Sequence, residues 1–591
     1  MVAFLNWSKS IALGTLNSIV KFIVFVVVVV LILMLIGFIH GDGLPDKMVL
    51  TADLRTPMAD SSRRPGLDFG NRPLTTMGTI LALDRASRDS RVRGLFLRVG
   101  EGGISVAQAE ELGAAIKRFR ASGRFVVVHS QGFDSAGMGD YLAAASANQI
   151  WMQPKSGFGA AGAGAGAVFL RGLFDKIDAV PQIAKRSDYK SAADMFMEKD
   201  YTAPDREQTT ALLQSWYDTA TRGAAEDRKL TPQAVAAVFE QSPQFAEDAQ
   251  RAHLIDRIGY DDDAKDAAIS QAGGGAKAVS LRRYAHNIED WGDGSLPHVA
   301  LVEAAGDIVD GGTHDGMGGS NVIAGDDYAT AIRDATHDSS IKAIVLRVDS
   351  PGGSVSASDQ ILDALKKAQR AGKPVVVSMG PLAASGGYYI STSANRIIAE
   401  PGTLTGSIGV LTGKVSFGKS VGLIGVGVDQ IGVGKNALMD SAVSAYTPEQ
   451  WANLNHQADV IYADFTQKVA DGRKLPIGKV QEIAKGRVWT GADAKARGLV
   501  DQLGSFWTAV DAAKKLSGIS ASQRVAFKIY PKRIGFFDAL GSAFSGTAAG
   551  VRALEGLSVI EQLPVARSMI GALSDAAQGG VQMKAENLPI H

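Results

Sequence analysis

The sequence predicts an α/β fold made of two tandem repeats with parallel sheets, preceded by one N-terminal transmembrane helix. Three observations support this prediction: an internal repeat, short β-branched runs that alternate with helical stretches, and one long apolar segment near the N-terminus. The chain has 591 residues. Because that length exceeds what one hydrophobic core can organise, at least two globular domains are expected.

Segments of the first half recur in the same order in the second half. The spacing is roughly 245–250 residues and drifts only by small gaps, as expected for a duplicated unit. The matched segments are Val92–Val99 with Ile341–Val348, Phe125–Val128 with Pro374–Val377, Ser146–Ile150 with Ser393–Ile397, and Leu254–Gly259 with Leu499–Gly504. The chain therefore contains two copies of one structural unit.

Each copy alternates buried strands with helices. Val345–Val348 and Val375–Ser378 are β-branched runs bounded by turn residues, which is typical of strands that are buried on both faces. Between them, Ala357–Arg370 carries apolar residues at helical spacing, and Gly372 follows as a stop signal. A strand, a helix and a second strand joined in this way predict a parallel βαβ unit.

The segment Phe22–Ile39 contains no charged residue and is long enough to cross about 30 Å of hydrocarbon as a helix. A secretory signal peptide is the competing interpretation, but Phe38–Asp42 offers no small-residue cleavage site. Lys9 and Lys21 precede the span and Asp42 follows it, so the positive-inside rule places the N-terminus in the cytoplasm. We therefore expect a retained single-pass anchor with the remaining chain outside the cytoplasm; in a bacterium, this means an inner-membrane anchor with the catalytic domains in the periplasm.

The predicted domain boundaries follow from the span and the repeat. Residues 1–45 are expected to form the cytoplasmic tail, the transmembrane anchor and a stalk, and residues 46–290 the N-terminal α/β repeat. Residues 291–517 are expected to form the C-terminal α/β repeat. Residues 518–591 have no counterpart in the first half, and the sequence assigns no role to this C-terminal extension.

Charge and composition exclude several classes of function. Lys+Arg and Asp+Glu both number 61, so the formal net charge is zero, whereas nucleic-acid binding needs a basic face. Cysteine is absent, which excludes thiol nucleophiles and cysteine-based metal sites. We therefore expect no nucleic-acid partner, no metal and no cofactor.

In the second repeat, two strands lead into turns that suit acyl-transfer chemistry. The first strand leads into Gly352-Gly353, where bare backbone N–H groups can approach a ligand closely. The second leads into Ser385, which Gly386-Gly387 and a helical stretch follow. A small serine at a helix N-terminus suits a nucleophile, and the Gly-Gly turn suits an oxyanion site.

The first repeat does not retain this serine. Alignment of the two Ser-Ala-Asn segments places Met138 opposite Ser385, and another gap placement puts Ser135 or Ala136 there. Methionine cannot act as a nucleophile. One repeat is therefore expected to be catalytic and the other to have lost that role.

A nucleophilic serine needs a base, and the nine histidines are poor candidates. His129, His253 and His456 fit surface or satisfied core positions better than a catalytic one. Lysine is the alternative where burial lowers the ammonium pKa; a shift from about 10.4 to 7–8 costs roughly 3–5 kcal/mol. Lys190 and Lys435 hold equivalent positions in the two repeats, so both are candidates.

The anchor, the duplicated α/β unit and three motifs together resemble the long form of bacterial signal peptide peptidase A (protease IV). The motifs are Ser350–Ser354 (SPGGS), Ala383–Tyr389 (AASGGYY) and Tyr189–Ala192 (YKSA). The likeness runs from the anchor to about residue 515. It implies a crotonase/Clp-like fold for each repeat, and a homotetramer.

The resemblance also implies a serine endopeptidase whose Ser/Lys dyad forms across the two repeats. Ser385 matches the family's nucleophile, Lys190 its base, and Ser407 a helper serine that hydrogen-bonds the lysine. The oxyanion hole is expected from backbone N–H groups of Gly352, Gly353 and Gly386. The implied substrates are cleaved signal peptides and other short apolar peptides at the periplasmic face of the inner membrane.

With Lys190 preferred as the base, Lys435 is expected to face the degenerate Met138 site. Three rival functions stay open. An acyl-CoA enzyme of the crotonase type would bind CoA, and a Clp-like Ser/His/Asp peptidase would need an essential histidine. A non-catalytic membrane scaffold would be unaffected by Ser385→Ala.

Overall fold

A computed structural model describes Lys21 and residues 43–61, 73–133, 137–286, 295–312, 322–531 and 582–584. The predicted membrane span, Phe22–Ile39, lies outside these residues. Within the described residues, no helix is both long enough and apolar enough to cross a membrane.

The first sheet lies in the first half of the chain, with the strand order β8-β4-β3-β2-β1-β9 and every neighbouring pair parallel. The strands are β1 (Met48–Asp53), β2 (Val92–Val99), β3 (Phe125–Ser130), β4 (Gln149–Met152), β8 (Arg257–Ile258) and β9 (Lys277–Ser280). The main helices are α2 (Thr76–Ala86), α3 (Val106–Ala121), α4 (Met138–Ala145), α7 (Ala203–Arg228) and α10 (Asp261–Gln271).

Helices cover both faces of this sheet, which explains the continuous apolar character of its strands. On one face, Phe96 and Val127 pack with Ala264 of α10. Because side chains alternate along a strand, the neighbouring Leu95 and Val126 point to the other face and join the core that includes α3. The predicted parallel α/β architecture is confirmed.

The second sheet has the order β19-β17-β15-β13-β10-β21, with β16 beside β15 and β20 beside β16. Its strands are β10 (His298–Ala305), β13 (Ile341–Ser350), β15 (Val375–Ala384), β16 (Arg396–Ala399), β17 (Leu404–Gly406), β19 (Val488–Thr490), β20 (Gln502–Leu503) and β21 (Ala526–Tyr530). All pairs are parallel except β17 with β19. β21 follows residue 517 and pairs with β10, so the second sheet includes part of the predicted C-terminal extension.

The helices of the second half repeat the arrangement of the first. They include α12 (Gly325–His337), α13 (Val355–Arg370), α14 (Gly386–Ser391), α16 (Pro448–Arg473), α17 (Ile477–Ile483), α18 (Gly491–Ala496) and α19 (Phe506–Leu516). α13 is the predicted crossover helix between β13 and β15. Its first turn is capped by the Ser354 side chain, which accepts from the Ala357 N–H.

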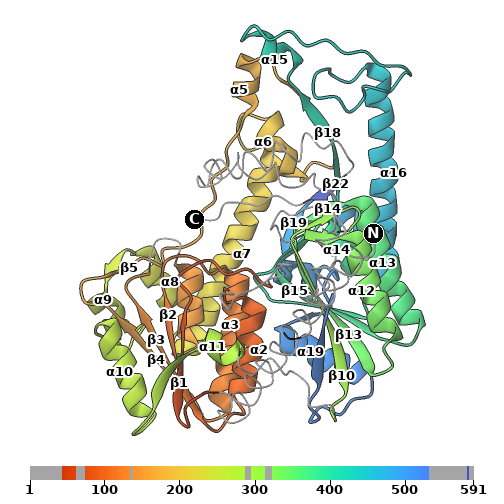
Figure 1. Ribbon diagram of the computed structural model, residues 1–591. Coiled ribbons are helices and arrows are strands. Elements are labelled where there is room, and N and C mark those ends of the chain that lie inside the picture. Colours follow the sequence, from red (N-terminus) through yellow and green to blue (C-terminus); the bar gives the residue numbers. More distant parts are fainter. Residues whose placement is uncertain are drawn as a thin grey trace, which may run out of the picture.

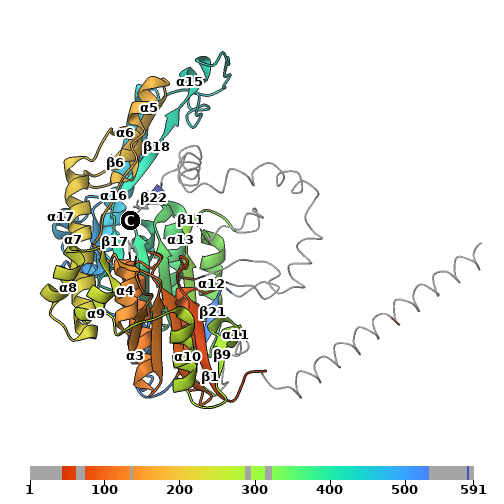
Figure 2. The same ribbon diagram turned by 90° about the vertical axis from the view of Figure 1, so that its left-hand side faces the viewer.

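A third sheet joins the two halves of the chain, in the order β12-β11-β14-β22-β18-β6. Its strands are β6 (Val180–Arg186), β11 (Asp307–Val309), β12 (Val322–Ala324), β14 (Gly352–Ser354), β18 (Val410–Ser416) and β22 (Gln582–Lys584). β6 of the first half and β18 of the second form an antiparallel ribbon, which rises from the two bodies toward α5 (Arg171–Lys176) and α15 (Gly418–Gly422) (Figures 1 and 2). The sequence did not predict that strands of the two repeats pair in one sheet.

The two repeats also share one continuous core. Ile116 of α3 belongs to the same apolar cluster as Val345 and Val376 of the second sheet. Across this interface, Arg347 donates to both carboxylate oxygens of Asp60, at 2.9 and 2.7 Å, and to Glu111 at 2.8 Å. All three side chains are at most 2% exposed, so these charges are compensated inside the interface and not by water.

Candidate active site

Ser385 lies between the end of β15 and the start of α14, as the sequence predicts. Its backbone has φ 55° and ψ −115°, a conformation that strains a residue with a side chain. Its N–H donates to the carbonyl oxygen of Gly406 at 2.8 Å, which holds the strained turn against β17. Strained serines at such junctions are typical of functional positions.

Lys190 reaches Ser385 from the other repeat. It follows β6 and precedes a short 3-10 helix, Ser191–Ala193. Its Nζ lies 2.8 Å from Ser385 Oγ, 3.0 Å from Ser407 Oγ and 3.1 Å from the carbonyl oxygen of Ser407. The three residues that the sequence singled out therefore meet in one cluster, although 195 residues separate Lys190 from Ser385.

Lys190 is buried deeply enough to change its charge state. Its side chain is 1% exposed, and burial lowers the pKa of Lys190 to about 7. Near neutral pH, a large fraction of this amine is therefore unprotonated and able to accept a proton.

Ser407 is held in place as firmly as Ser385. It also has a positive φ, 50°, and is buried. Its N–H donates to the carbonyl oxygen of Arg487 at 2.8 Å. Because its hydroxyl and its carbonyl both contact Lys190 Nζ, Ser407 fixes the direction in which the amine points.

The segment 485–488 connects the backbones that carry Lys190 and Ser407. The Lys485 carbonyl accepts from Tyr189 N–H at 3.1 Å, and Gly486 N–H donates to the Ile408 carbonyl at 2.9 Å. We call residues 485–488 the bridging segment. Sequence reasoning missed it, because nothing in its composition marks it out from an ordinary loop.

Gln208 of α7 is a second residue that sequence reasoning missed. It is buried, and its Nε2 donates to the Tyr189 carbonyl at 3.1 Å and to Ser191 Oγ at 2.9 Å, on either side of Lys190. Its Oε1 accepts from the Val488 N–H at 3.3 Å. One amide side chain thus links the lysine loop of the first repeat to the bridging segment of the second.

The predicted oxyanion turn lies directly against the start of α14. Gly352 and Gly353 have φ 108° and 146°, and a Cβ on Gly353 would stand 2.0 Å from the carbonyl oxygen of Ile308. A Cβ on Gly386 would stand 3.1 Å from Gly353 N. Only glycines allow this approach.

The three predicted oxyanion donors are not equivalent. The Gly352 N–H already donates to Ser350 Oγ at 3.1 Å, within its own turn. Gly353 and Gly386 are therefore the better candidates to donate toward a group at Ser385.

Strand β22 crosses this site. It pairs antiparallel with β14, with Met583 opposite Gly353, and its residue Gln582 pairs with Leu411 of β18. It also contacts α14. An extended segment of the chain thus occupies the space between the oxyanion turn and the ribbon.

Contacts of two tyrosines establish the equivalent position in the first repeat. Tyr141 donates to the Leu254 carbonyl, and Tyr388 donates to the Leu499 carbonyl, both at 2.9 Å. Since Leu254 and Leu499 are equivalent in the repeat, Tyr141 corresponds to Tyr388, and Met138 lies opposite Ser385. The first of the two predicted alignments therefore agrees with the structure.

Lys435 does not face Met138. Its side chain is 68% exposed and pairs with Glu449, whereas Met138 is buried. The prediction that Lys435 faces the degenerate site is wrong within this chain, because Lys435 lies in the exposed segment beyond the ribbon and not at its base.

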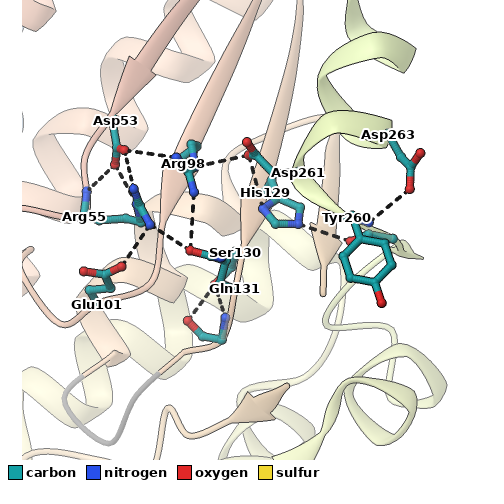
Figure 3. Close-up of polar contacts among 12 residues, drawn as sticks. Asp53, Arg55, Arg98, Glu101, His129, Ser130, Gln131, Tyr260, Asp261 and Asp263 are labelled. Carbon is teal, nitrogen blue, oxygen red and sulfur yellow. Dashed lines mark hydrogen bonds and ion pairs between the residues drawn. The ribbon is translucent and has the colours of Figure 1, made fainter. Parts of the chain in front are cut away.

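The carboxyl ends of β1, β2 and β3 in the first repeat carry a polar network (Figure 3). Arg55 bonds Asp53, Glu101 and Gln131, and Arg98 pairs with Asp261. His129 Nε2 lies 3.1 Å from the Gly259 carbonyl oxygen, and burial lowers the pKa of His129. In the described part of the chain, Ser385 Oγ is hydrogen-bonded by Lys190 and by no histidine.

No group of three or more metal-binding side chains is suitably arranged to hold a metal ion in the described ranges. The chemistry available at Ser385 is that of a buried hydroxyl, a buried amine of lowered pKa and nearby backbone N–H groups. This combination suits nucleophilic acyl transfer.

The model of peptidase family S49 matches the chain twice, at residues 118–273 and 367–520. The Clp protease model matches residues 331–401. Each half of the chain therefore contains one S49 match.

Curated proteases are similar over most of the chain. Protease 4 of Salmonella typhi is 33% identical over 453 residues, which cover 74% of this chain and 71% of that protein. The chloroplastic serine protease SPPA of Arabidopsis thaliana is 30% identical, covering 80% of this chain and 70% of that protein. Protease 4 of Haemophilus influenzae is 30% identical, with 75% and 73% covered.

Among solved structures, a membrane-bound stomatin-specific protease, 1510-N, is 18% identical, and the match covers 42% of this chain and 99% of that one. The TM-score is 0.26, too low to support an argument. The two family matches and the similarity to the Protease 4 proteins support the assignment. The chain is a serine protease that belongs to peptidase family S49.

Proposed function

We propose that this protein is a signal peptide peptidase that uses Ser385 as nucleophile and Lys190 as general base. The observation that carries this proposal is the 2.8 Å contact between Lys190 Nζ and Ser385 Oγ, deep inside the junction of the two repeats. Burial lowers the pKa of Lys190 to about 7, so the amine can accept a proton near neutral pH.

In the proposed mechanism, neutral Lys190 takes the proton of Ser385 as Oγ attacks a peptide carbonyl carbon. The N–H groups of Gly353 and Gly386 stabilise the oxyanion that forms. The protonated amine then gives its proton to the leaving nitrogen, and the C–N bond breaks to leave an ester on Ser385. Lys190 next deprotonates a water, which attacks the ester carbon. The bond between that carbon and Ser385 Oγ then breaks, and protonated Lys190 returns its proton to Oγ as the acid leaves.

Ser407 acts as a helper in this scheme. Its hydroxyl and its carbonyl oxygen contact the amine at 3.0 and 3.1 Å, which limits the rotation of Nζ. An amine held in one direction loses less entropy when it meets the serine proton. Ser407 thus keeps Lys190 aimed at Ser385.

The proposed substrate is an extended apolar peptide that pairs with β14 and β18. β22 already pairs with both strands, which indicates that the gap between them accepts a peptide as an added strand. One similar protein, 32% identical over 36% of this chain, is named a putative signal peptide peptidase. Cleaved signal peptides are short and apolar, so they suit the gap between β14 and β18, which we call the slot.

The cellular setting is also part of this proposal. We place the catalytic repeats in the periplasm, beside the inner membrane, held by the N-terminal span Phe22–Ile39. The homotetramer that the family resemblance implies belongs to the same proposal. An anchored enzyme of this kind would meet signal-peptide remnants where they are released.

Labelling with a serine-directed fluorophosphonate tests the chemistry. The full chain is solubilised in detergent, labelled, digested and mapped by mass spectrometry. The proposal expects an adduct on Ser385 that is lost in Lys190→Ala and retained in Lys435→Ala, the matched control on the exposed equivalent lysine. An unlabelled Ser385 in a folded protein would contradict the mechanism and favour a scaffold.

A further inference from the structure

The first repeat contains a turn that corresponds to the oxyanion turn of the second. α3 begins at Val106 after the capping residue Ser105, and α13 begins at Val355 after the capping residue Ser354. Counting back from these helices, Ile104 occupies the place of Gly353. The turn between β2 and α3 therefore has the same position relative to its helix as the turn between β13 and α13.

The turn of the first repeat is filled by a carboxylate. Asp140, in the first turn of α4, is 0% exposed. Its Oδ1 accepts from the Gly100 N–H at 3.2 Å. The backbone N–H groups of Gly102 and Ile104 act on the carboxylate too, and both lower its pKa. Its Oδ2 is buried and has no hydrogen-bond partner.

In the second repeat, the same position has no side chain. The match of Tyr141 with Tyr388 makes Asp140 equivalent to Gly387. A Cβ on Gly387 would point at Ser350, 2.7 Å from its carbonyl oxygen, which is toward the turn. The two repeats thus share the turn and differ in whether a side chain fills it.

We propose that the first repeat retains an anion-binding turn equivalent to the oxyanion turn, and that Asp140 is its permanent internal ligand. The ligand class of this site is a carboxylate, which is planar and accepts several N–H donors at once. This inference goes beyond the proposed function, because it concerns the repeat that lacks the serine. Among the described residues, the turn beside Ser385 is then the one of the two without an internal carboxylate.

Two opposing effects set the pKa of Asp140. Burial raises the pKa of Asp140 to about 6, and the N–H groups of the turn act in the opposite direction. Above pH 7 the group is therefore charged although it is fully enclosed. The N-terminus of α4, which directs N–H groups and a partial positive charge toward Asp140, adds to this stabilisation.

The filled turn supports the elements that present Lys190. α4 packs against α3 and α7. α3 carries Glu111, which pairs with Arg347, and α7 carries Gln208, which holds the lysine loop. We expect the loss of the internal anion to loosen this scaffold without touching the reacting atoms.

The test replaces the internal carboxylate by a free one. In the full detergent-solubilised chain, Asp140→Gly removes the side chain, and Tm is measured in sodium formate and in sodium chloride of equal ionic strength. We expect Asp140→Gly to lower Tm by about 5 °C or more in chloride, because buried N–H groups lose their acceptor. Formate should restore at least about half of that loss in a saturable way.

Asp140→Asn and the unaltered chain are the controls. Both keep a side chain in the turn, so neither should gain stability in formate over chloride. If Asp140→Gly does not fold in chloride, recovery of folded protein on refolding in formate supports the site. Equal behaviour of Asp140→Gly in formate and chloride, or an equal formate effect on the unaltered chain, overturns it.

Discussion

A methyl group on Gly486 would stand 2.6 Å from the Cβ of Lys190. The two residues belong to different repeats, yet the main chain of the bridging segment passes directly against the lysine. Gly486 also has φ 76°, a conformation that residues with side chains rarely adopt. The main chain at Gly486 therefore helps to set the position of Lys190, and a side chain at Gly486 would not fit there.

Gly486→Ala is expected to lower kcat by about 10- to 100-fold, because a displacement of Lys190 on the order of 1 Å disturbs the proton transfer. The measurement is turnover of a fluorogenic peptide at pH 8. Gly478→Ala in α17 is the control, since a Cβ there meets no heavy atom within 4 Å. Equal kcat in both variants would show that the contact does not position the amine.

Activity is expected to rise with pH through about 7. The pKa of Lys190 is lowered to about 7, and only the unprotonated amine can accept the serine proton. Below that value kcat/KM should therefore fall about tenfold per pH unit, and above it the profile should level off. A profile of kcat/KM from pH 5 to 9 checks this, with Lys190→Arg as the comparison.

The guanidinium of Lys190→Arg stays protonated at every pH in that range. The variant is thus expected to be inactive throughout, with Tm recorded to show that it is folded. Activity that rises through pH 7 in this variant would mean that another group is the base.

Arg347→Met is expected to destabilise the chain by about 3–5 kcal/mol, because it leaves two buried carboxylates, Asp60 and Glu111, without their cation. Urea unfolding followed by circular dichroism measures the change. Arg370→Met provides the control, since Arg370 is 65% exposed and only weakly paired with Asp363. A loss no larger than that of the control would argue against a charge-compensated interface.

Met583→Pro is expected to speed the labelling of Ser385 by a peptidyl phosphonate by about tenfold, because a strand that occupies the slot reduces its apparent affinity for peptides. Proline has no N–H to donate and disrupts the pairing of β22 with β14. Met583→Ala retains that N–H and serves as the control. Equal labelling rates in the two variants would indicate that β22 does not compete with peptides.

The sequence predicted those site residues that lie in recognisable motifs. Ser385, Ser407 and Lys190 could be identified because each lies in a segment that matches a family motif, and the structure brings these side chains together. The parallel α/β architecture was also predictable, since strands buried on both faces leave a continuous apolar signature.

The contacts that hold the site together were not predictable in the same way. Gln208 accepts a hydrogen bond from Val488, 280 residues away, and Gly486 packs against Lys190 of the other repeat. Neither local pattern differs from that of an ordinary helix or loop residue. The pairing of β6 with β18 was missed for a related reason. A ribbon between two repeats depends on how the bodies dock, which hydrophobic periodicity within one strand does not reveal.

The antiparallel ribbon of β6 and β18 has a consequence for the time at which the protein becomes reactive. Lys190 is synthesised 217 residues before Ser407, and the two are joined only when the late strand pairs with the early one. A growing chain therefore holds an amine without its serine, and a fragment of either half holds one partner alone. If the proposed dyad is the catalytic centre, proteolytic activity appears only after the second half has folded onto the first, and the chain stays inactive while it is being synthesised.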